Sequence, residues 1–464
     1  MGRDLRPASQ SPFRPTHQGI DVLGIAMAVV RPFRGIIYNP ELIHDLKNVV
    51  APPYDVIPES DFRLYYRRHG HNVVHLILGK VYPFDTPGRN RYTRAGEYFH
   101  NWLSDGVLLR DREPGFYAYS QTFTYKDQPT RHRVGLMALV ELARYDERII
   151  LPHEETFPKP KEHLKALRRA CKAHLSPVFA VFSDPIREVD ALIDPGERPP
   201  IMDVKDAHGN RHCVWRITSP KVCQRIQELM EDKQIIIVDG HHRYETTLEL
   251  RDEFCAEDPD GAASGAYDYV LMFLANSHDE GLTIFPTHRL CAGIEDFQVE
   301  DFLARAREVF TVEPIEAADP TEASNALAQA MAERGKTTAA FGICIAPSRL
   351  YLTTLADHGP IDELSDPELP EAYRRLDVHI LHTYLIDDCL GIPKERYYEH
   401  ISYTRNDAEV VEAVTGGQAQ VGFFMNPTKM AQVEEVARLG LRMPQKSTYF
   451  YPKLLTGLVI NQFG

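Results

Sequence analysis

The chain has 464 residues, which is too long for one small hydrophobic core and favours two domains. Its hydrophobic content of 43% and aromatic content of 10% are typical of a globular protein. The formal net charge of −14 argues against a nucleic acid or an anionic membrane surface as the main partner.

The cysteines and the N-terminus predict a cytoplasmic protein. The 7 cysteines are scattered and none forms a CxxC pair, so a zinc-ribbon site is not expected and reduced thiols are. The first residues, 1–20, lack the apolar core of a signal peptide and are predicted to form a disordered leader. No apolar run is long enough to cross a membrane.

Helix and strand patterns alternate through the first half of the chain. The predicted elements are a strand with a turn at 26–38, a short helix at 39–47, a helix at 92–104, neighbouring strands at 115–125 and 133–142, a helix within 151–177, a strand at 178–184, a long connection at 184–200 and a helix at 219–231. The prolines of the segment 49–58 predict a rigid loop that carries Asp55, with Glu59 just beyond it.

The stretch 234–250 is the most informative part of the chain. Its apolar residues 235–238 are β-branched and predict a buried strand, which Asp239 and Gly240 end. Strong helix formers follow from Arg243, so a strand enters a tight turn and a helix leaves it.

This turn has the chemistry of an anion site. The N–H groups at the start of a helix are unpaired and lie at the positive end of its dipole. With Arg243 beside them, and with His241 and His242 in the same turn, they favour the binding of phosphate. The alternative is purely structural, with Asp239 capping the helix.

The second half continues the mixed pattern. The predicted elements are strands at 269–277 and 281–290, helices at 296–309 and 320–334, strands at 338–345 and 349–354, an exposed loop at 355–370, helices at 370–390 and 428–439, and a packed segment at 443–462. We therefore expect an α/β (α+β) fold with mixed sheets. A leader at 1–20 precedes an N-terminal catalytic domain at 21–290, and a smaller C-terminal domain at 291–464 contributes KSTYFYPK.

Four further polar clusters follow apolar segments: Pro53-Tyr54-Asp55, His153-Glu154-Glu155-Thr156, Pro286-Thr287-His288-Arg289, and Lys446-Ser447-Thr448 with Lys453. Each alone could be ordinary surface polarity. Together they supply cations that neutralise a transferred phosphoryl group and acids that accept a proton from a hydroxyl. The chain has no Walker A loop, no kinase Gly-rich or HRD signature and no HExxH motif, so the common kinase folds and the zincins are excluded.

Five motifs in order resemble the bacterial domain of unknown function 1015 family over nearly the whole chain: VAPPYDVI (50–57), HEETFPKPK (153–161), VDGHHRYETTLEL (238–250), GLTIFPTHRL (281–290) and MPQKSTYFYPKLLTG (443–457). Locally, IIIVDGHHR is similar to the phosphate-binding box of the ParB/sulfiredoxin superfamily, in which free L-serine kinases carry a DGHHR box. The resemblance implies a ParB/sulfiredoxin-like phosphate-binding core and a kinase that phosphorylates free L-serine or a similar small molecule. Its cofactors would be Mg²⁺ with ATP or ADP, and pyrophosphate stays open as the donor.

The expected roles follow from this resemblance and from the clusters. The predicted phosphate- and nucleotide-binding residues are Gly240, His241, Arg243, Thr287, His288, Arg289, Lys446 and Lys453. The predicted catalytic residues are Asp55, Asp239 and His242, with Glu59, His153 and Glu154 as second choices. Asp55 is inferred as the base from its rigid loop and not from a motif match, because the resembling kinases generally have Glu at that point.

Two other functions remain open. The imidazoles of His153, His241, His242 and His288, with Asp239 and Glu154, could hold the metal of a hydrolase or phosphatase. The same anion site could instead serve a nucleotide-sensing regulatory protein without turnover. The expected partners are a small-molecule substrate and a nucleotide, without nucleic acid or membrane; the oligomeric state is open, with a homodimer considered.

Overall fold

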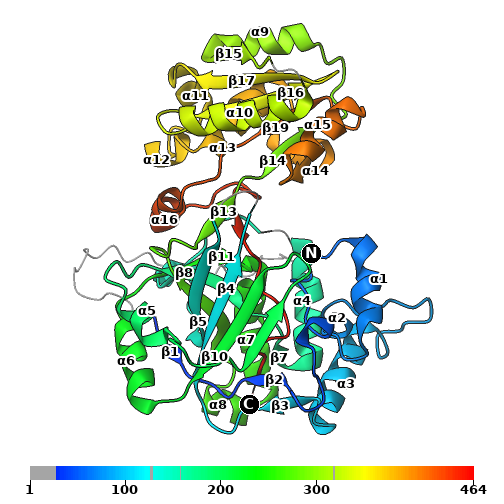
Figure 1. The fold of residues 1–464 in the computed structure, drawn as a ribbon, viewed down its shortest axis with the longest axis vertical. Coiled ribbons are helices and arrows are strands. Elements are labelled where there is room, and N and C mark those ends of the chain that lie inside the picture. Colours follow the sequence, from blue (N-terminus) through cyan, green and yellow to red (C-terminus); the bar gives the residue numbers. More distant parts are fainter. Residues whose placement is uncertain (1–27, 126–128, 157, 317–318, 464) are drawn as a thin grey trace, which may run out of the picture.

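The computed structural model describes residues 28–125, 129–156, 158–316 and 319–463, and the predicted leader at 1–20 lies outside them. Two sheets with covering helices lie at opposite ends of the long axis (Figure 1). This arrangement confirms the predicted α/β fold with mixed sheets. None of the helices in the described ranges is both long and apolar enough to span a membrane.

The larger sheet fills one end of the molecule. Within the described ranges it has nine strands, in the order β6 (Ile150–Leu151), β11 (Ile235–Asp239), β8 (Val178–Phe182), β12 (Tyr269–Asn276), β5 (Arg131–Glu141), β4 (Phe116–Phe123), β10 (Arg211–Ile217) and β9 (Met202–Lys205), with β1 (Val30–Arg31) paired to β5. It is mixed, because β11 runs parallel to β6 and antiparallel to β8.

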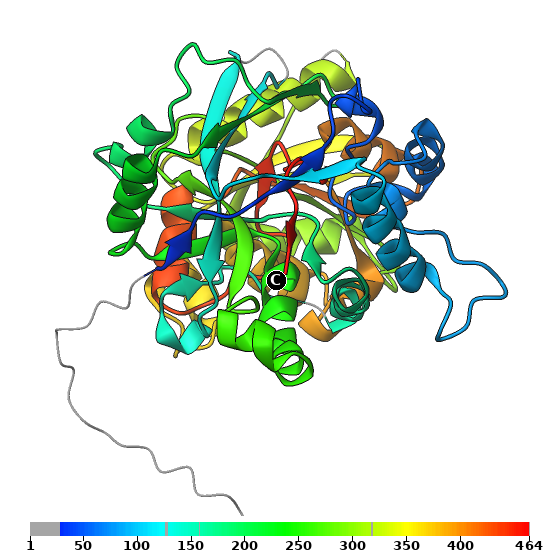
Figure 2. The same cartoon turned by 90° about the horizontal axis from the view of Figure 1, so that it is seen from below.

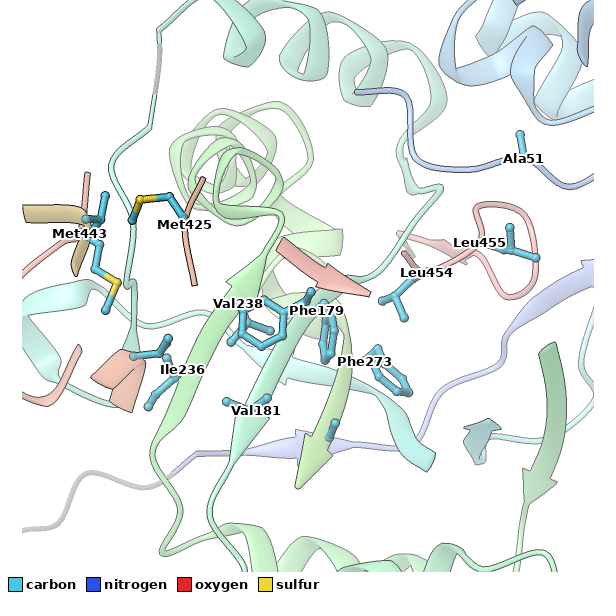
Figure 3. Packing of buried hydrophobic residues seen from close by; sticks show 14 of the residues in the cluster. Ala51, Phe179, Val181, Ile236, Val238, Phe273, Met425, Met443, Leu454 and Leu455 are labelled. Atoms are coloured by element: carbon cyan, nitrogen blue, oxygen red, sulfur yellow. The ribbon is translucent and has the colours of Figure 1, made fainter. Parts of the chain in front are cut away.

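Strand β11 is buried on both faces, as its unbroken apolar run predicts. Ile236 and Val238 pack with Phe179 and Phe273 on one face (Figure 3). Ile235 and Ile237 belong to the cluster on the other face. Helices cover both faces: α3 (Arg91–Ser104) and α4 (Pro158–Cys171) the first, and α5 (Glu188–Ile193) and α6 (Pro220–Met230) the second.

The smaller sheet is antiparallel throughout. Among the described residues its six strands run in the order β15 (Phe310–Pro314), β17 (Arg349–Leu355), β16 (Ala340–Ile345), β19 (Val421–Phe424), β14 (His288–Cys291) and β18 (Ile401–Thr404). Its helices are α9 (Val299–Val309), α10 (Pro320–Arg334), α11 (Gly359–Leu364), α12 (Glu371–Arg374), α13 (Asp377–Ile380), the π-helix η3 (Leu381–Cys389), α14 (Tyr397–His400), α15 (Asp407–Thr415) and α16 (Met430–Arg438). We call residues 288–438 the six-stranded unit.

The C-terminal segment returns to the larger sheet. Strand β20 (Tyr449–Tyr451) pairs with β13 (Thr283–Phe285), and β21 (Asn461–Gln462) pairs with β7 (Ala173–His174). Seen from below, this red segment runs through the middle of the molecule (Figure 2). The prediction that 443–462 is packed is confirmed, while the division at residues 290 and 291 into two domains stays a proposal.

Several predicted elements differ from the structure. The expected single strand at 281–290 is two strands, β13 and β14, in different sheets, because Pro286 lacks the N–H that a continuous strand needs. The expected helix at 39–47 is a turn followed by the 3₁₀ helix η1 (Leu46–Asn48), since the Asn39 side chain accepts from Glu41 N–H and competes with helix. The connection at 184–200 contains α5, the loop at 355–370 contains α11, and the helix at 370–390 is broken into α12, α13 and η3.

The remaining elements surround these sheets. They are β2 (Ile36–Tyr38), α1 (Glu59–Arg68), α2 (Val74–Ile77), β3 (Leu108–Arg110), η2 (Tyr145–Glu147), α7 (His241–Glu257), α8 (Pro259–Ser264) and η4 (Lys394–Arg396). The helix that the sequence predicts after the turn at Asp239 and Gly240 is α7. The first residues of α7 line a cavity together with Asp239 and Gly240.

Candidate functional site

The turn between β11 and α7 depends on glycine. Gly240 has φ = 89°, in the left-handed region that glycine adopts without strain. A Cβ atom there would also lie 2.7 Å from Arg243 Nε. Gly240 is the N-cap of α7 and no side chain caps the helix, so the alternative in which Asp239 serves as the cap is wrong.

Asp239 instead holds two cations. Its Oδ2 accepts from Arg243 Nη2 at 2.5 Å, and its Oδ1 pairs with Lys453 Nζ. Burial raises the pKa of Asp239, but the charges of Lys453 and Arg243 outweigh that effect and hold the pKa well below its usual range. Asp239 is therefore a carboxylate that ties the C-terminal segment to the turn.

Arg243 faces inward. Its Nη1 donates to the Pro177 carbonyl and its Nη2 pairs with Asp239, and its side chain is only 6% exposed. The guanidinium thus fixes the turn against the start of β8. The sequence predicts it as a phosphate ligand, and the structure shows that both its Nη1 and its Nη2 already donate within the protein.

The turn opens onto a cavity of about 280 Å³. Of the residues predicted for the site, ten line it: Asp55, Glu154, Asp239, Gly240, His241, His242, Arg243, Thr287, Lys446 and Lys453. They come from the loop before α1, the loop after β6, the β11–α7 turn, the β13–β14 link and the C-terminal segment. The fold therefore brings together most of the clusters that lie far apart in the sequence.

Four predicted residues do not line this cavity. Glu59 is exposed at the first position of α1. His288 pairs with Asp407 at 2.9 Å, and its Nδ1 accepts from the Met425 N–H. Arg289 is fully buried, and its guanidinium donates to the carbonyls of Thr287 and Lys446.

The fourth, His153, lies behind the cavity wall. Its Nδ1 contacts the Ile237 carbonyl at 2.7 Å, and its Nε2 lies 2.8 Å from Thr448 Oγ1. Burial lowers the pKa of His153 to about 4, so the imidazole is neutral near pH 7. Its ring packs 4.9 Å from that of His241, whose pKa burial also lowers well below its ordinary value.

Two carboxyl groups of the cavity are not held by a cationic side chain. Asp55 is exposed, and among the described residues no hydrogen-bond partner of its carboxylate is found. Glu154 Oε1 accepts from Lys446 N–H at 2.8 Å, and burial raises the pKa of Glu154 to about 7. Asp239 is clamped by cations and Glu155 pairs with Lys394, so Asp55 and Glu154 are the available proton acceptors.

Lys446 is held in an unusual conformation. It has φ = 59°, which is rare for a residue with a side chain and marks local strain. Glu154 accepts from its N–H and Arg289 donates to its carbonyl, so both of its peptide groups are fixed. The backbone is thus constrained while the ammonium group stays exposed at the cavity.

A family model described as "Protein of unknown function (DUF1015)" matches residues 30–379. The chain belongs to this family. A search of curated proteins found no match.

Some solved structures are similar to the chain. A free serine kinase variant in complex with AMP is 13% identical at a TM-score of 0.36, covering 73% of this chain and 96% of its own. A conserved hypothetical protein from Pyrococcus furiosus is 13% identical at a TM-score of 0.33, and the match covers 69% of this chain and 92% of that protein. SbnI with a C-terminal truncation, from Staphylococcus aureus, is 13% identical at a TM-score of 0.32, and the match covers 69% of this chain and 85% of that protein. Such TM-scores do not carry a function from one protein to another.

In this member of the family, a larger groove of about 670 Å³ adjoins the cavity. Its walls are rich in aromatic rings, among which Phe285 packs 4.0 Å from Tyr125 and 4.6 Å from Tyr451 between ring centres. Tyr403, Arg405 and Tyr449 line both the cavity and the groove. Tyr449 lies within the motif at 443–457, but no motif surrounds Tyr403 and Arg405, and only the fold brings β18 beside β20.

The histidines do not form a metal centre. Among the described residues, no group of three or more His, Cys, Asp or Glu side chains is placed to hold a metal ion. His153 and His288, which the hydrolase alternative needs, are bonded elsewhere. All 7 cysteines are free thiols.

Proposed function

We propose that the protein is a phosphotransferase that moves a phosphoryl group from a nucleotide to the hydroxyl of free L-serine or a similar small molecule. One observation carries this proposal. Asp55, a carboxylate without a bonded partner among the described residues, lines the same small cavity as the start of α7 and four cationic side chains. A proton acceptor and an anion site in one cavity are what phosphoryl transfer requires.

The phosphates would bind at the start of α7. The N–H groups of a first helical turn have no partner inside the helix, and the helix dipole favours an anion there. Lys446 and Lys453 add positive charge. Asp239 and Arg243 act indirectly, because they hold Lys453 and the turn in place.

In the transfer step the substrate hydroxyl oxygen attacks the terminal phosphorus. A new O–P bond forms while the bond from that phosphorus to the bridging oxygen breaks, and the bridging oxygen leaves with the shortened donor. The hydroxyl proton passes to the Asp55 carboxylate. Glu154 is the second acid in reach of the cavity, with a pKa near 7 that suits proton exchange.

The groove would accept the nucleoside of the donor, because its aromatic walls can stack with a base. Mg²⁺ is usually held by one or two carboxylates together with phosphate oxygens, and Glu154, which lines the cavity, would be one of those carboxylates. When bound, the ion would neutralise charge on the phosphates. A sensing role without turnover uses the same residues and differs only in leaving the donor intact.

The test compares Asp55→Asn with wild type in an assay for O-phosphoserine from L-serine and nucleotide. Asp55→Asn should bind nucleotide but lose turnover by about 100-fold or more, since a general base contributes this much. The control is Glu59→Gln, because Glu59 lies outside the cavity and should leave turnover unchanged. Turnover in Asp55→Asn at the wild-type rate would contradict the proposed base.

A further inference from the structure

The six-stranded unit presents one arginine to the site. Arg405 follows β18 directly, in the corner before α15. The corner is fixed on both sides: Thr404 Oγ1 donates to Glu409, and Asn406 Oδ1 accepts from the Ala408 N–H at 3.1 Å. The position of Arg405 is therefore set by the six-stranded unit.

Its side chain reaches the C-terminal segment. The guanidinium carbon lies 3.8 Å from the ring centre of Tyr449, which belongs to β20. Lys453 Nζ lies 4.4 Å from the same ring centre. Two cations thus share one aromatic ring, where the junction of cavity and groove brings all three side chains together.

Arg405 is an exposed arginine of this unit that lines both the cavity and the groove. Some other exposed arginines of the unit form ion pairs, such as Arg349 with Glu300 and Arg305 with Asp388. For Arg405, no carboxylate lies within ion-pair distance in the part of the chain that the structure describes. Acidic residues outnumber Lys and Arg by 66 to 52, so a cation that lines this cavity without a carboxylate partner indicates an anion from outside.

We propose that Arg405 binds a phosphate group of the donor where the cavity meets the groove, and that this is the contribution of the six-stranded unit to the site. The inference rests on the proposed phosphate site. A guanidinium has a planar fork of donors that matches two phosphate oxygens, which an ammonium group cannot do. The phosphate chain of the donor would lie in the cavity and its nucleoside in the groove. Arg405 would then bind the phosphate that joins the two.

The experiment is calorimetric titration of pyrophosphate and of ADP into the full-length protein. Arg405→Ala should weaken ADP binding by about 10- to 100-fold, the range of a charge-assisted hydrogen bond. Arg405→Lys keeps the charge and the contact with Tyr449 but loses the fork, so it should lie between Arg405→Ala and wild type. Arg349→Ala, an exposed arginine paired with Glu300, is the matched control and should bind as wild type does.

The outcomes separate this inference from the proposed function. If wild type binds neither pyrophosphate nor ADP, both fail. If wild type binds and Arg405→Ala binds equally well, the phosphate site stands and the role of Arg405 is overturned. Unfolding midpoints of all variants show whether a loss of binding reflects lost structure; Arg405→Gln, which keeps a polar side chain of similar length, replaces Arg405→Ala if that variant unfolds.

Discussion

The carboxyl of Glu154 should make the protein less stable as the pH rises towards neutrality. Its pKa is about 7 in the folded protein and has an ordinary value of 4.5, and burial is the main cause. The folded state therefore binds more protons than the unfolded state between these two values. The contribution of Glu154 to stability is then greatest below pH 4.5, falls across the window from 4.5 to 7, and stays reduced above it.

The size of this effect follows from the shift. Each pKa unit corresponds to about 1.4 kcal/mol, so ionised Glu154 costs about 3 kcal/mol of unfolding free energy at pH 8. The side chain is only 18% exposed, so solvent screens this cost little. Glu154→Gln removes the charge and keeps an oxygen that can accept from Lys446 N–H.

The assay is urea unfolding of wild type and Glu154→Gln at pH 5 and pH 8. The variant should unfold at a higher urea concentration than wild type at pH 8, and the two midpoints should approach each other at pH 5. Glu333→Gln serves as the control, because Glu333 lies near the end of α10 in an exposed ion pair with Lys336. Its unfolding midpoint should follow that of wild type at both pH values. Equal midpoints at pH 8 for wild type and Glu154→Gln would refute the reasoning.

Three further changes test the turn and its neighbours. Asp239→Asn leaves two cations uncompensated and should cost about 3–5 kcal/mol of unfolding free energy at pH 7. Because the pKa of Asp239 is depressed in the folded protein, this contribution is present above the unfolded pKa and is lost only in strong acid. Urea unfolding of the variant and wild type at pH 7 and pH 3 measures it. Gly240→Ala should lower the melting temperature and weaken pyrophosphate binding, since φ = 89° costs a side chain about 1–2 kcal/mol and its Cβ would meet Arg243; unchanged melting would contradict this. Lys446→Gly should raise stability by about 1 kcal/mol by relieving φ = 59°, yet weaken pyrophosphate binding, and a lower melting temperature would count against strain there.

The local part of the site could be predicted from the sequence. The β-branched run before Asp239 and the break at Gly240 are determined by near neighbours, so the strand, turn and helix follow from residue type. The clusters at Glu154 and Lys446 can also be found in the sequence, where they gain meaning as a set, and the fold places both at one cavity.

The rest depends on long-range packing. Residues 281–290 look like one strand, but their two halves pair with strands far along the chain, β20 and β18. That pairing turns His288 and Arg289 away from the cavity and brings Arg405 towards it. No local pattern marks Arg405, whose role depends on Tyr449 and Lys453 more than forty residues later.

The most direct test of the account is to incubate the protein with magnesium, L-serine and either ATP, ADP or pyrophosphate, and to look for O-phosphoserine by mass spectrometry. The account predicts a product with at least one nucleotide, and its loss in Asp55→Asn. Absence of product with all three donors, from protein shown to be folded and to bind nucleotide, would contradict phosphoryl transfer to serine.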